Sequence, residues 1–192
     1  EETLIMGTIF FGIQIYCDFS GYTDIAIGSA KIMGFDLIDN FKRPYFSKNI
    51  QAFWRRWHIS LTSWFRDYIY IPLGGNRGKK INWYSNILIV FLIAGLWHGA
   101  NWTFLAWGAL HGYYLIFFLE IRNIGRKIND YIGLQKLSIL NHLFQAGIVF
   151  ILVNIGWIFF RSNTVNDAFY IIVKIMINIP NIYWEFSVLQ MI

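Results

Sequence analysis

Charged side chains are scarce in this sequence. Asp, Glu, Lys and Arg together make up 14% of its 192 residues, whereas soluble domains usually carry about 25%. Hydrophobic residues make up 56% and aromatic residues 20%, and several apolar runs are long enough to cross a bilayer. The composition therefore excludes an ordinary soluble domain and predicts an all-α protein, a polytopic bundle of transmembrane helices.

Cysteine and the common metal-binding and hydrolase motifs are nearly absent as well. The one cysteine, Cys17, cannot form an internal disulfide. The four histidines show neither HxxH nor HExxH spacing, and there is no CxxC pair, so no metal site is predicted. The lack of a G-x-S-x-G motif argues against a serine hydrolase. Because the sequence begins without an initiator methionine or a basic leader, we expect a single-domain fragment, the C-terminal part of a longer chain.

Positive charge is concentrated in one segment. The net charge is +5, and nine of the sixteen Lys and Arg residues lie between Lys42 and Lys80, opposed by Asp67 alone. By the positive-inside rule, this segment is predicted to be cytoplasmic. A membrane location explains the basic pI without nucleic acid as a partner. The nine residues are Lys42, Arg43, Lys48, Arg55, Arg56, Arg66, Arg77, Lys79 and Lys80.

Hydrophobic patterning divides the chain into five helical segments. Two apolar segments are predicted spans, one is predicted to be a helical hairpin, and two others are expected at the membrane interface. The first interfacial helix is expected to begin at a Ser47 cap and to run unbroken to about Tyr70. In chain order the segments are the span 4–35, the interfacial or re-entrant helix 47–70, the hairpin 83–121, the span 143–160 and the interfacial helix 164–179.

Span lengths predict where the hairpin turns. At about 1.5 Å per residue, residues 83–97 cover roughly 22 Å, which is short of the roughly 30 Å hydrocarbon core. Residues 102–121 cover about 30 Å and can cross. The simplest arrangement is a hairpin whose turn at residues 99–101 lies below the far surface, with both basic ends in the cytoplasm. His98 would then lie at the floor of a depression that opens outward.

His98 is the strongest candidate for a functional residue. Ionisable residues at membrane depth are functional by default, although a core histidine that donates to a neighbouring carbonyl fits the spacing equally well. Gly95 and Gly99 allow another group to approach closely, and imidazole, with a reference pKa of about 6.5, can accept a proton from a hydroxyl at neutral pH. His58 is expected to be a second catalytic or orienting group, or part of an aromatic interface belt. His111 is predicted to pack or to hydrogen-bond between helices.

Acidic residues in the first span suggest a second function. Asp18 and Asp24, together with His98, are candidates for a proton path, which would make the protein a proton-coupled transporter or channel. Alternatively, the two carboxylates pair with Lys31 or with an arginine. Asp24 and Lys31 share one helix face, which we expect to look into protein or water because a carboxylate that faces lipid is costly. The full face is Ser20, Asp24, Gly28 and Lys31.

Two longer blocks of sequence resemble a known family. FWRRWHISLTSWFRDYIYIPLGGNRGKK and GLWHGANWTFLAWGALHG are similar to the signature blocks of the membrane-bound O-acyltransferase (MBOAT) family, in particular its bacterial alginate O-acetyltransferase-like branch. GWIFFR, which ends at Arg161, resembles a further motif of that branch. The resemblance covers about residues 11 to 161 and implies the MBOAT fold in a multi-pass protein of the bacterial cytoplasmic membrane.

The resemblance also implies a reaction. His98 corresponds to the family's catalytic histidine and His58 to its second position. The implied donor is acetyl-CoA, and the implied acceptor is an extracytoplasmic polysaccharide such as alginate or peptidoglycan, reached with a periplasmic or surface acetyltransferase partner. The aromatic and basic segment before His58 is a candidate either for lipid phosphates or for the anionic arm of the donor. Its candidate donor-binding residues are Trp54, Arg55, Arg56 and Trp57.

Overall fold

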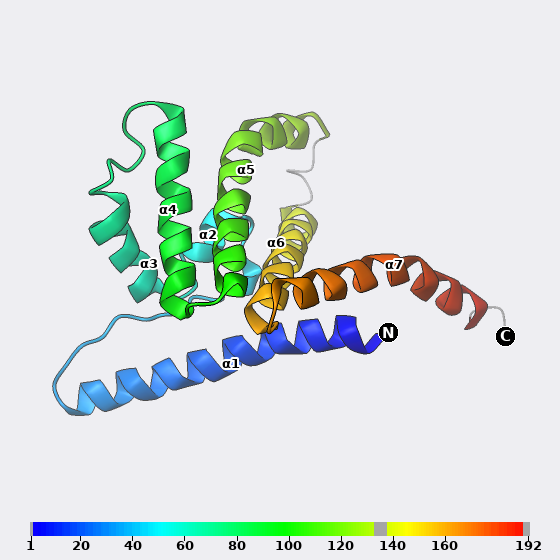
Figure 1. Ribbon diagram of the computed structural model, residues 1–192, viewed down its shortest axis with the longest axis horizontal. Helices are drawn as coiled ribbons and strands as arrows, with labels where there is room; N and C mark the ends of the chain where they lie inside the picture. The colour runs from blue at the N-terminus through cyan, green and yellow to red at the C-terminus, as the bar shows by residue number, and fades with distance from the viewer. Residues whose placement is uncertain (1, 133–137, 190–192) are drawn as a thin grey trace.

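This computed structural model describes residues 2–132 and 138–189, and the regular elements in these two stretches are all helical. Within them, five helices are long and two are short (Figure 1). The all-α prediction is confirmed. In chain order the helices are α1 (Glu2–Ile32), α2 (Ile50–Trp54), α3 (Ile59–Phe65), α4 (Lys80–His98), α5 (Trp102–Ile132), α6 (Ser138–Arg161) and α7 (Val165–Leu189). A 3-10 turn, η1 (Pro44–Phe46), precedes α2, and a π-helix, η2 (Arg66–Tyr70), follows α3.

Four segments among the described residues are long and apolar enough to cross a membrane. They correspond to the predicted spans 4–35 and 143–160 and to the two arms of the predicted hairpin. α1 does not run beside the hairpin, however. In Figure 1 it lies crosswise below the α4–α5 turn, and it packs against α6 and α7. The segments are Thr3–Ile32, Lys80–His98, Trp102–Arg122 and Ile139–Arg161.

α4 and α5 form the predicted hairpin. The turn between them occupies residues 99–101, as the span lengths indicated. At the opposite, open end, the ammonium group of Lys80 lies 2.6 Å from a carboxylate oxygen of Glu120, which ties the start of α4 to α5. The two basic ends of the hairpin are therefore adjacent, and the turn lies one helix length away from them (Figure 1).

Glycines allow α4 and α5 to pack with their backbones close together. A Cβ atom at Gly95 would collide with the backbone carbonyl of Phe104, and a Cβ at Gly108 would collide with the backbone carbonyl of Phe91. At Gly99, a Cβ would lie 2.8 Å from the Phe104 ring. The group that approaches Gly95 and Gly99 is thus helix α5 itself. Their small size serves helix packing here.

The unbroken helix predicted over residues 47–70 is wrong, because the chain bends sharply at His58. This residue separates α2 from α3 and has a left-handed backbone, with φ 44° and ψ 57°. The predicted Ser47 cap is also wrong. Asn49 caps α2 instead, since its side-chain oxygen accepts a hydrogen bond of 2.8 Å from the backbone N–H of Ala52.

A preceding loop holds this bend in place. The backbone carbonyl of Asn40 accepts a hydrogen bond from Ile59 N–H at 3.1 Å, and its side-chain oxygen accepts from the N–H and hydroxyl of Ser60 at 3.1 and 2.6 Å. Lys42 N–H donates to the carbonyl of Arg56 at 3.0 Å. These bonds satisfy backbone groups that a broken helix would leave open. They offset the roughly 1–2 kcal/mol that a left-handed non-glycine residue costs.

Replacing Gly108 with alanine is expected to destabilise the protein by about 1–3 kcal/mol, because the added methyl group forces α4 and α5 apart. Gly147→Ala on α6 is the matched control, since nothing lies within 4 Å of a Cβ built there. Alanine is favoured over glycine in a helix interior by about 1 kcal/mol, so the control should be neutral or stabilising. Thermal unfolding in detergent measures both variants, and equal effects would contradict the packing role of Gly108.

Candidate active site

A cavity of about 650 Å³ lies between the α2–α3 segment and helices α4, α5 and α6. On α4, its wall includes Trp83, Ile87, Val90, Ala94 and His98, together with Phe91. Their spacing of three or four residues puts them on one helix face. At about 1.5 Å per residue this face is roughly 22 Å long, so the cavity follows α4 from its first turn to its last residue. An elongated cavity with mainly apolar and aromatic walls fits a thin, extended ligand.

The two ends of this cavity differ in chemistry. Near the start of α4 it is lined by Asn76 and Arg122. Arg66, which directly follows α3, also lines the cavity and is hydrogen-bonded to Asp67 at 2.7 and 3.0 Å. At the other end, beside the α4–α5 turn, lies His98. Guanidinium groups bind phosphate oxygens well, and an imidazole can carry a proton. The cavity therefore joins a basic, anion-binding end to a histidine end.

The His98 ring is half-buried among aromatic side chains. Its centroid lies 4.9 Å from that of Phe160, 5.1 Å from that of Trp107 and 6.2 Å from that of Phe104. Within the described side chains, residues 3–122 and 139–177, the ring makes no hydrogen bond. The packing thus fixes the position of the ring, while its nitrogen atoms remain able to bind a ligand in the cavity.

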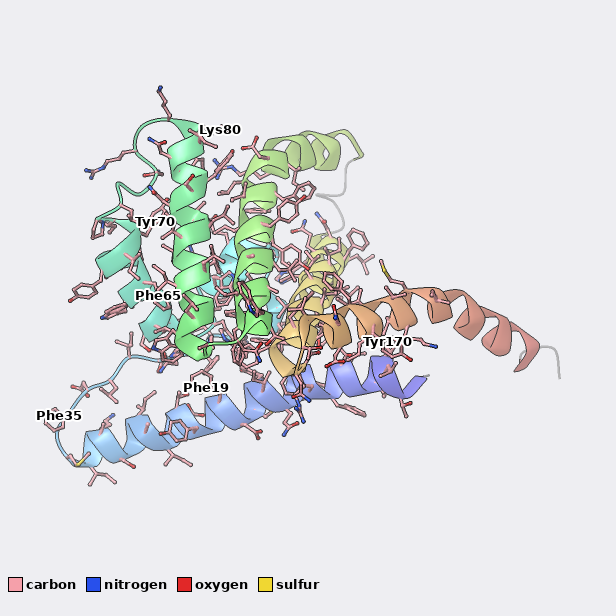
Figure 2. All side chains as sticks on the ribbon, in the orientation of Figure 1. Phe19, Phe35, Phe65, Tyr70, Lys80 and Tyr170 are labelled. Atoms are coloured by element: carbon pink, nitrogen blue, oxygen red, sulfur yellow. The ribbon has the colours of Figure 1, made fainter. Side chains whose placement is uncertain are left out.

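His58 lines the same cavity from the bend between α2 and α3. Its ring lies edge-on to Phe19, 4.8 Å away between centroids, and Figure 2 shows Phe19 on α1 below the α4–α5 turn. The ring of Trp97 lies 6.0 Å from His58 and 4.9 Å from His98. The structure therefore brings the two predicted histidines together at one end of the cavity, with one indole in contact with both.

Burial determines the protonation state of His58. The surrounding apolar side chains disfavour the charged ring and lower its pKa from 6.5 to about 4. At neutral pH His58 is therefore uncharged, with one nitrogen that donates a hydrogen bond and one that accepts. Such a ring can orient or polarise a carbonyl group without adding charge to the cavity.

Three of the four candidate donor-binding residues lie on the cavity wall. Trp54, Arg55 and Trp57 line it, with Trp57 almost fully buried and Arg55 exposed. Arg56 does not line the cavity, and its backbone carbonyl holds the preceding loop through Lys42. A role for the first three in donor binding fits their position. For Arg56, donor binding stays a prediction without positional support.

His111 is buried in the core, as its predicted packing role required. It is 0% exposed. The centroid of its ring lies 5.0 Å from that of Trp54 and 5.1 Å from that of Trp107, and both of these residues line the cavity. A Cβ atom at Gly156 would lie 2.5 Å from its Nε2 atom, so that glycine makes room for the ring. Neither ring nitrogen has a hydrogen-bond partner among the described residues. His111 therefore packs behind the cavity and does not form the interhelical hydrogen bond that was the other option.

The residues of the possible proton path are not brought together. Asp18 and Asp24 are exposed on α1, and neither carboxylate lines the cavity that contains His98. From α1, Ile15 and Phe19 contribute to that wall. Lys31, on the same face as Asp24, is exposed as well. The geometry thus gives no support to the transporter alternative.

Tyr45 is a structural residue of the site that the sequence pattern did not single out. Its hydroxyl donates a hydrogen bond to the carbonyl of Gly12 and accepts one of 3.2 Å from the indole N–H of Trp157. Burial raises the pKa of Tyr45 well above its ordinary value, so it stays a donor at all ordinary pH values. Through these bonds, η1 joins α1 to α6. In the sequence, the position of Tyr45 directly after Pro44 was the signal that could have pointed to this structural role.

Comparison with known proteins agrees with this geometry. The model of the MBOAT, membrane-bound O-acyltransferase, family matches residues 3–160. This range includes every residue that lines the cavity. The chain belongs to the membrane-bound O-acyltransferase family. Membership of the MBOAT family confirms the resemblance seen in the two sequence blocks and the membrane-helical fold class.

The names of similar curated proteins each state an acyl transfer and a polymer. A probable alginate O-acetylase AlgI of Pseudomonas syringae pv. tomato is 45% identical over 163 residues, 85% of this chain and 29% of the relative. A peptidoglycan O-acetyltransferase of Helicobacter pylori is 44% identical over the same shares of each chain. A teichoic acid D-alanyltransferase of Streptococcus thermophilus is 34% identical over 145 residues, 72% of this chain and 32% of the relative. The chain thus spans about a third of the length of these relatives.

The stability of the protein in acid is expected to depend on His58. Because its pKa is about 4 in the folded protein and about 6.5 in an unfolded chain, the unfolded state takes up the proton first as the pH falls. The contribution of the neutral His58 ring to the free energy of unfolding is then fully present above about pH 6.5. It is lost progressively as the pH falls toward 4. His58→Asn removes the titrating ring and tolerates the left-handed backbone, so unfolding midpoints measured between about pH 7 and pH 4 should fall less in this variant.

His58→Gly serves as a second variant, since glycine also adopts a left-handed backbone without strain. The two variants should show the same reduced dependence on pH. An unchanged acid dependence in both would show that the His58 ring is not the titrating group.

Proposed function

We propose that the protein is a membrane O-acyltransferase that moves acetyl from a cytoplasmic thioester donor, acetyl-CoA, to an extracytoplasmic polysaccharide or to a partner acetyltransferase. One observation carries this proposal: a single elongated cavity is lined by Arg122 near the start of α4 and by both His58 and His98 at the other end, with Arg55 and Arg66 also on its wall. The envelope polymers in the names of the relatives support the class of acceptor.

The donor is proposed to enter at the basic end. The phosphate groups of a coenzyme A thioester are complementary to Arg122 at this end and to Arg66 elsewhere on the cavity wall. Its long, thin arm fits the apolar face of α4 and carries the acetyl group toward His98. The aromatic walls exclude water from the thioester, which limits wasteful hydrolysis. Trp54 and Trp57, which also line the cavity, are proposed to contact the arm.

The chemical step is proposed to use His98 as general base. It takes the proton from the acceptor hydroxyl as the oxygen attacks the thioester carbonyl carbon. The carbon–sulfur bond then breaks, and the leaving thiolate receives the proton. His58, which is neutral, donates a hydrogen bond to the carbonyl oxygen or orients the donor. A positioned base typically contributes about 10²- to 10⁴-fold in rate, and the alignment of the two substrates supplies the rest.

The proposed sidedness follows from charge. The basic loop before α4 is assigned to the cytoplasm by the positive-inside rule, which places the arginine end of the cavity where acetyl-CoA is found. The α4–α5 turn then faces the outside of a bacterial cytoplasmic membrane, where the polysaccharide and a periplasmic or surface partner are located. Membrane lipid is proposed to cover the exposed apolar faces of the long helices.

Substitution of His98 tests this function. In membranes that contain the full-length protein, His98→Ala is expected to lower acetyl transfer from labelled acetyl-CoA by at least about 10²-fold, because the general base is lost. His142→Ala is the matched control. That histidine lies on α6, contacts the carbonyl of Phe46 at 3.0 Å and does not line the cavity. Immunoblots should show normal membrane levels of both variants.

Two results would contradict the proposal. Transfer retained in His98→Ala would exclude a catalytic role for this histidine. Proton flux in proteoliposomes without any thioester turnover would instead support the transporter alternative built on Asp18, Asp24 and His98.

A further inference from the structure

A glycine-rich loop connects η2 to α4 at the open end of the α4–α5 hairpin. Figure 2 labels Tyr70 and Lys80, between which this loop runs. The glycines let the chain turn repeatedly, because they adopt positive φ angles without strain. The loop then depends on side chains to fix its course. Its glycines with positive φ are Gly74 at 100°, Gly75 at 60° and Gly78 at 87°.

One buried side chain of α4 holds the loop. Asn86 is 7% exposed, and its amide nitrogen donates to the carbonyl of Leu73 at 3.1 Å and to that of Gly75 at 2.9 Å. An asparagine amide group has two N–H donors, so the loop takes up both of them. Asn86 therefore ties two neighbouring turns of the loop to the helix that carries His98.

The loop forms one rim of the donor cavity, the cavity of about 650 Å³ that contains His98. Asn76 directly follows Gly75 in the chain and lines the cavity. Tyr70, at the start of the loop, lines it as well, and a Cβ atom at Gly75 would lie 3.4 Å from the Tyr70 ring. The position of Asn76 on the cavity wall is thus set one residue away from a carbonyl that Asn86 binds.

Positive charge at this rim is not balanced by the nearest carboxylates. Glu120 is paired with Lys80 at 2.6 Å, and Asp67 is paired with Arg66 at 2.7 Å. These are the two ion pairs among the described side chains, residues 3–122 and 139–177. An anion at the rim would therefore meet cations that these acids leave free. They are Arg77 and Lys79 in the loop and Arg122 on the cavity wall.

Phosphate is the anion that such a rim can recognise on a thioester donor. With the acetyl group at His98, the far end of a pantetheine arm lies near the start of α4, where Asn76 and Arg122 line the cavity. Amide and guanidinium N–H groups both donate to phosphate oxygens. In coenzyme A and in the arm of a carrier protein, pantetheine carries a phosphate ester at this end.

From these observations we propose that Asn86 is a positioning residue of the donor site. By holding the loop, it keeps Asn76 on the cavity wall, where Asn76 and Arg122 bind the phosphate ester of the pantetheine arm. This inference rests on the proposed acyl transfer and names the part of the donor on which its recognition depends. Asn86 acts through the loop and does not touch the donor.

The test compares three donors in membranes that contain the full-length protein. They are acetyl-CoA, acetyl-phosphopantetheine and acetyl-pantetheine, which has no phosphate. Asn86→Ala should raise KM for the two phosphate-bearing donors by about tenfold, because charge-assisted hydrogen bonds are lost. It should leave KM for acetyl-pantetheine unchanged. It should also leave kcat unchanged for all three, since His58 and His98 lie at the other end of the cavity.

Asn76→Ala tests the contact residue itself. Asn76 is exposed, so its replacement leaves the packing of the helices intact, and it should raise the same two KM values. This variant remains informative if Asn86→Ala lowers the amount of protein in the membrane. Asn82→Ala is the matched control, because Asn82 is an exposed asparagine one turn before Asn86 on α4 and does not line the cavity. Its loss should change none of the constants.

Three results would overturn the proposal. Unchanged KM values for the phosphate-bearing donors in Asn76→Ala and Asn86→Ala would exclude the phosphate site. In Asn86→Ala, an equal rise in KM for acetyl-pantetheine, or a fall in kcat with all three donors, would leave Asn86 a purely structural residue.

Wild-type protein distinguishes the two sources of the phosphate, and both outcomes support the site. A lower KM for acetyl-CoA than for acetyl-phosphopantetheine assigns the rim to the nucleotide end of coenzyme A. Equal values assign it to the single phosphate of a carrier-protein arm.

Direct binding separates this site from the proposed function. Titration of His98→Ala protein with coenzyme A, followed by the fluorescence of tryptophans such as Trp83 on the cavity wall, should show binding. Adding Asn86→Ala should weaken this binding about tenfold. Both results are expected even if wild-type protein transfers no acetyl group, in which case only the acyltransferase function fails. If wild-type protein uses acetyl-pantetheine with the same KM as acetyl-CoA, the phosphate site is wrong and the acyltransferase function stands.

Discussion

The close approach of α4 and α5 is the contact on which the rest of the structure depends. It is possible because glycines at positions 95 and 108 let each helix backbone lie against a carbonyl of the other. That approach fixes the α4–α5 turn and therefore the position of His98 at the last residue of α4. It also holds one face of α4 toward α2 and α3, and this face becomes the long wall of the donor cavity. A wider spacing between α4 and α5 would displace both His98 and the cavity wall on α4.

The second constraint is aromatic packing around polar groups. His58, His98 and His111 are each packed between several rings, which hold them in place by shape and burial. This packing keeps His58 neutral at physiological pH. His58 has a left-handed backbone, and the hydrogen bonds that Asn40 accepts from Ile59 and Ser60 offset the cost of this conformation.

Sequence reasoning succeeded where local length and periodicity decide the outcome. The apolar spans, the hairpin turn and the pairing of its basic ends were predictable, since a helix rises by a fixed distance per residue. The continuous helix over residues 47–70 was wrong because its pattern is helical on both sides of the bend. The bend is held by hydrogen bonds with Asn40 and Lys42, which lie outside the segment. The crosswise course of α1 was likewise not encoded in its own pattern.

By itself, the sequence determined the helical class and the hairpin, and it singled out His58 and His98 as candidate site residues. Composition, helix length and the two family blocks are local properties, which is why they could be read from it. Only the tertiary structure decided which candidates share a site. It placed Trp54, Arg55 and Trp57 on the cavity wall and left out Arg56, Asp18 and Asp24. It also revealed that Asn86 holds the loop before α4. The physical reason is that a cavity is formed by side chains from segments far apart in the chain, and its shape depends on how the helices cross, which no local spacing specifies.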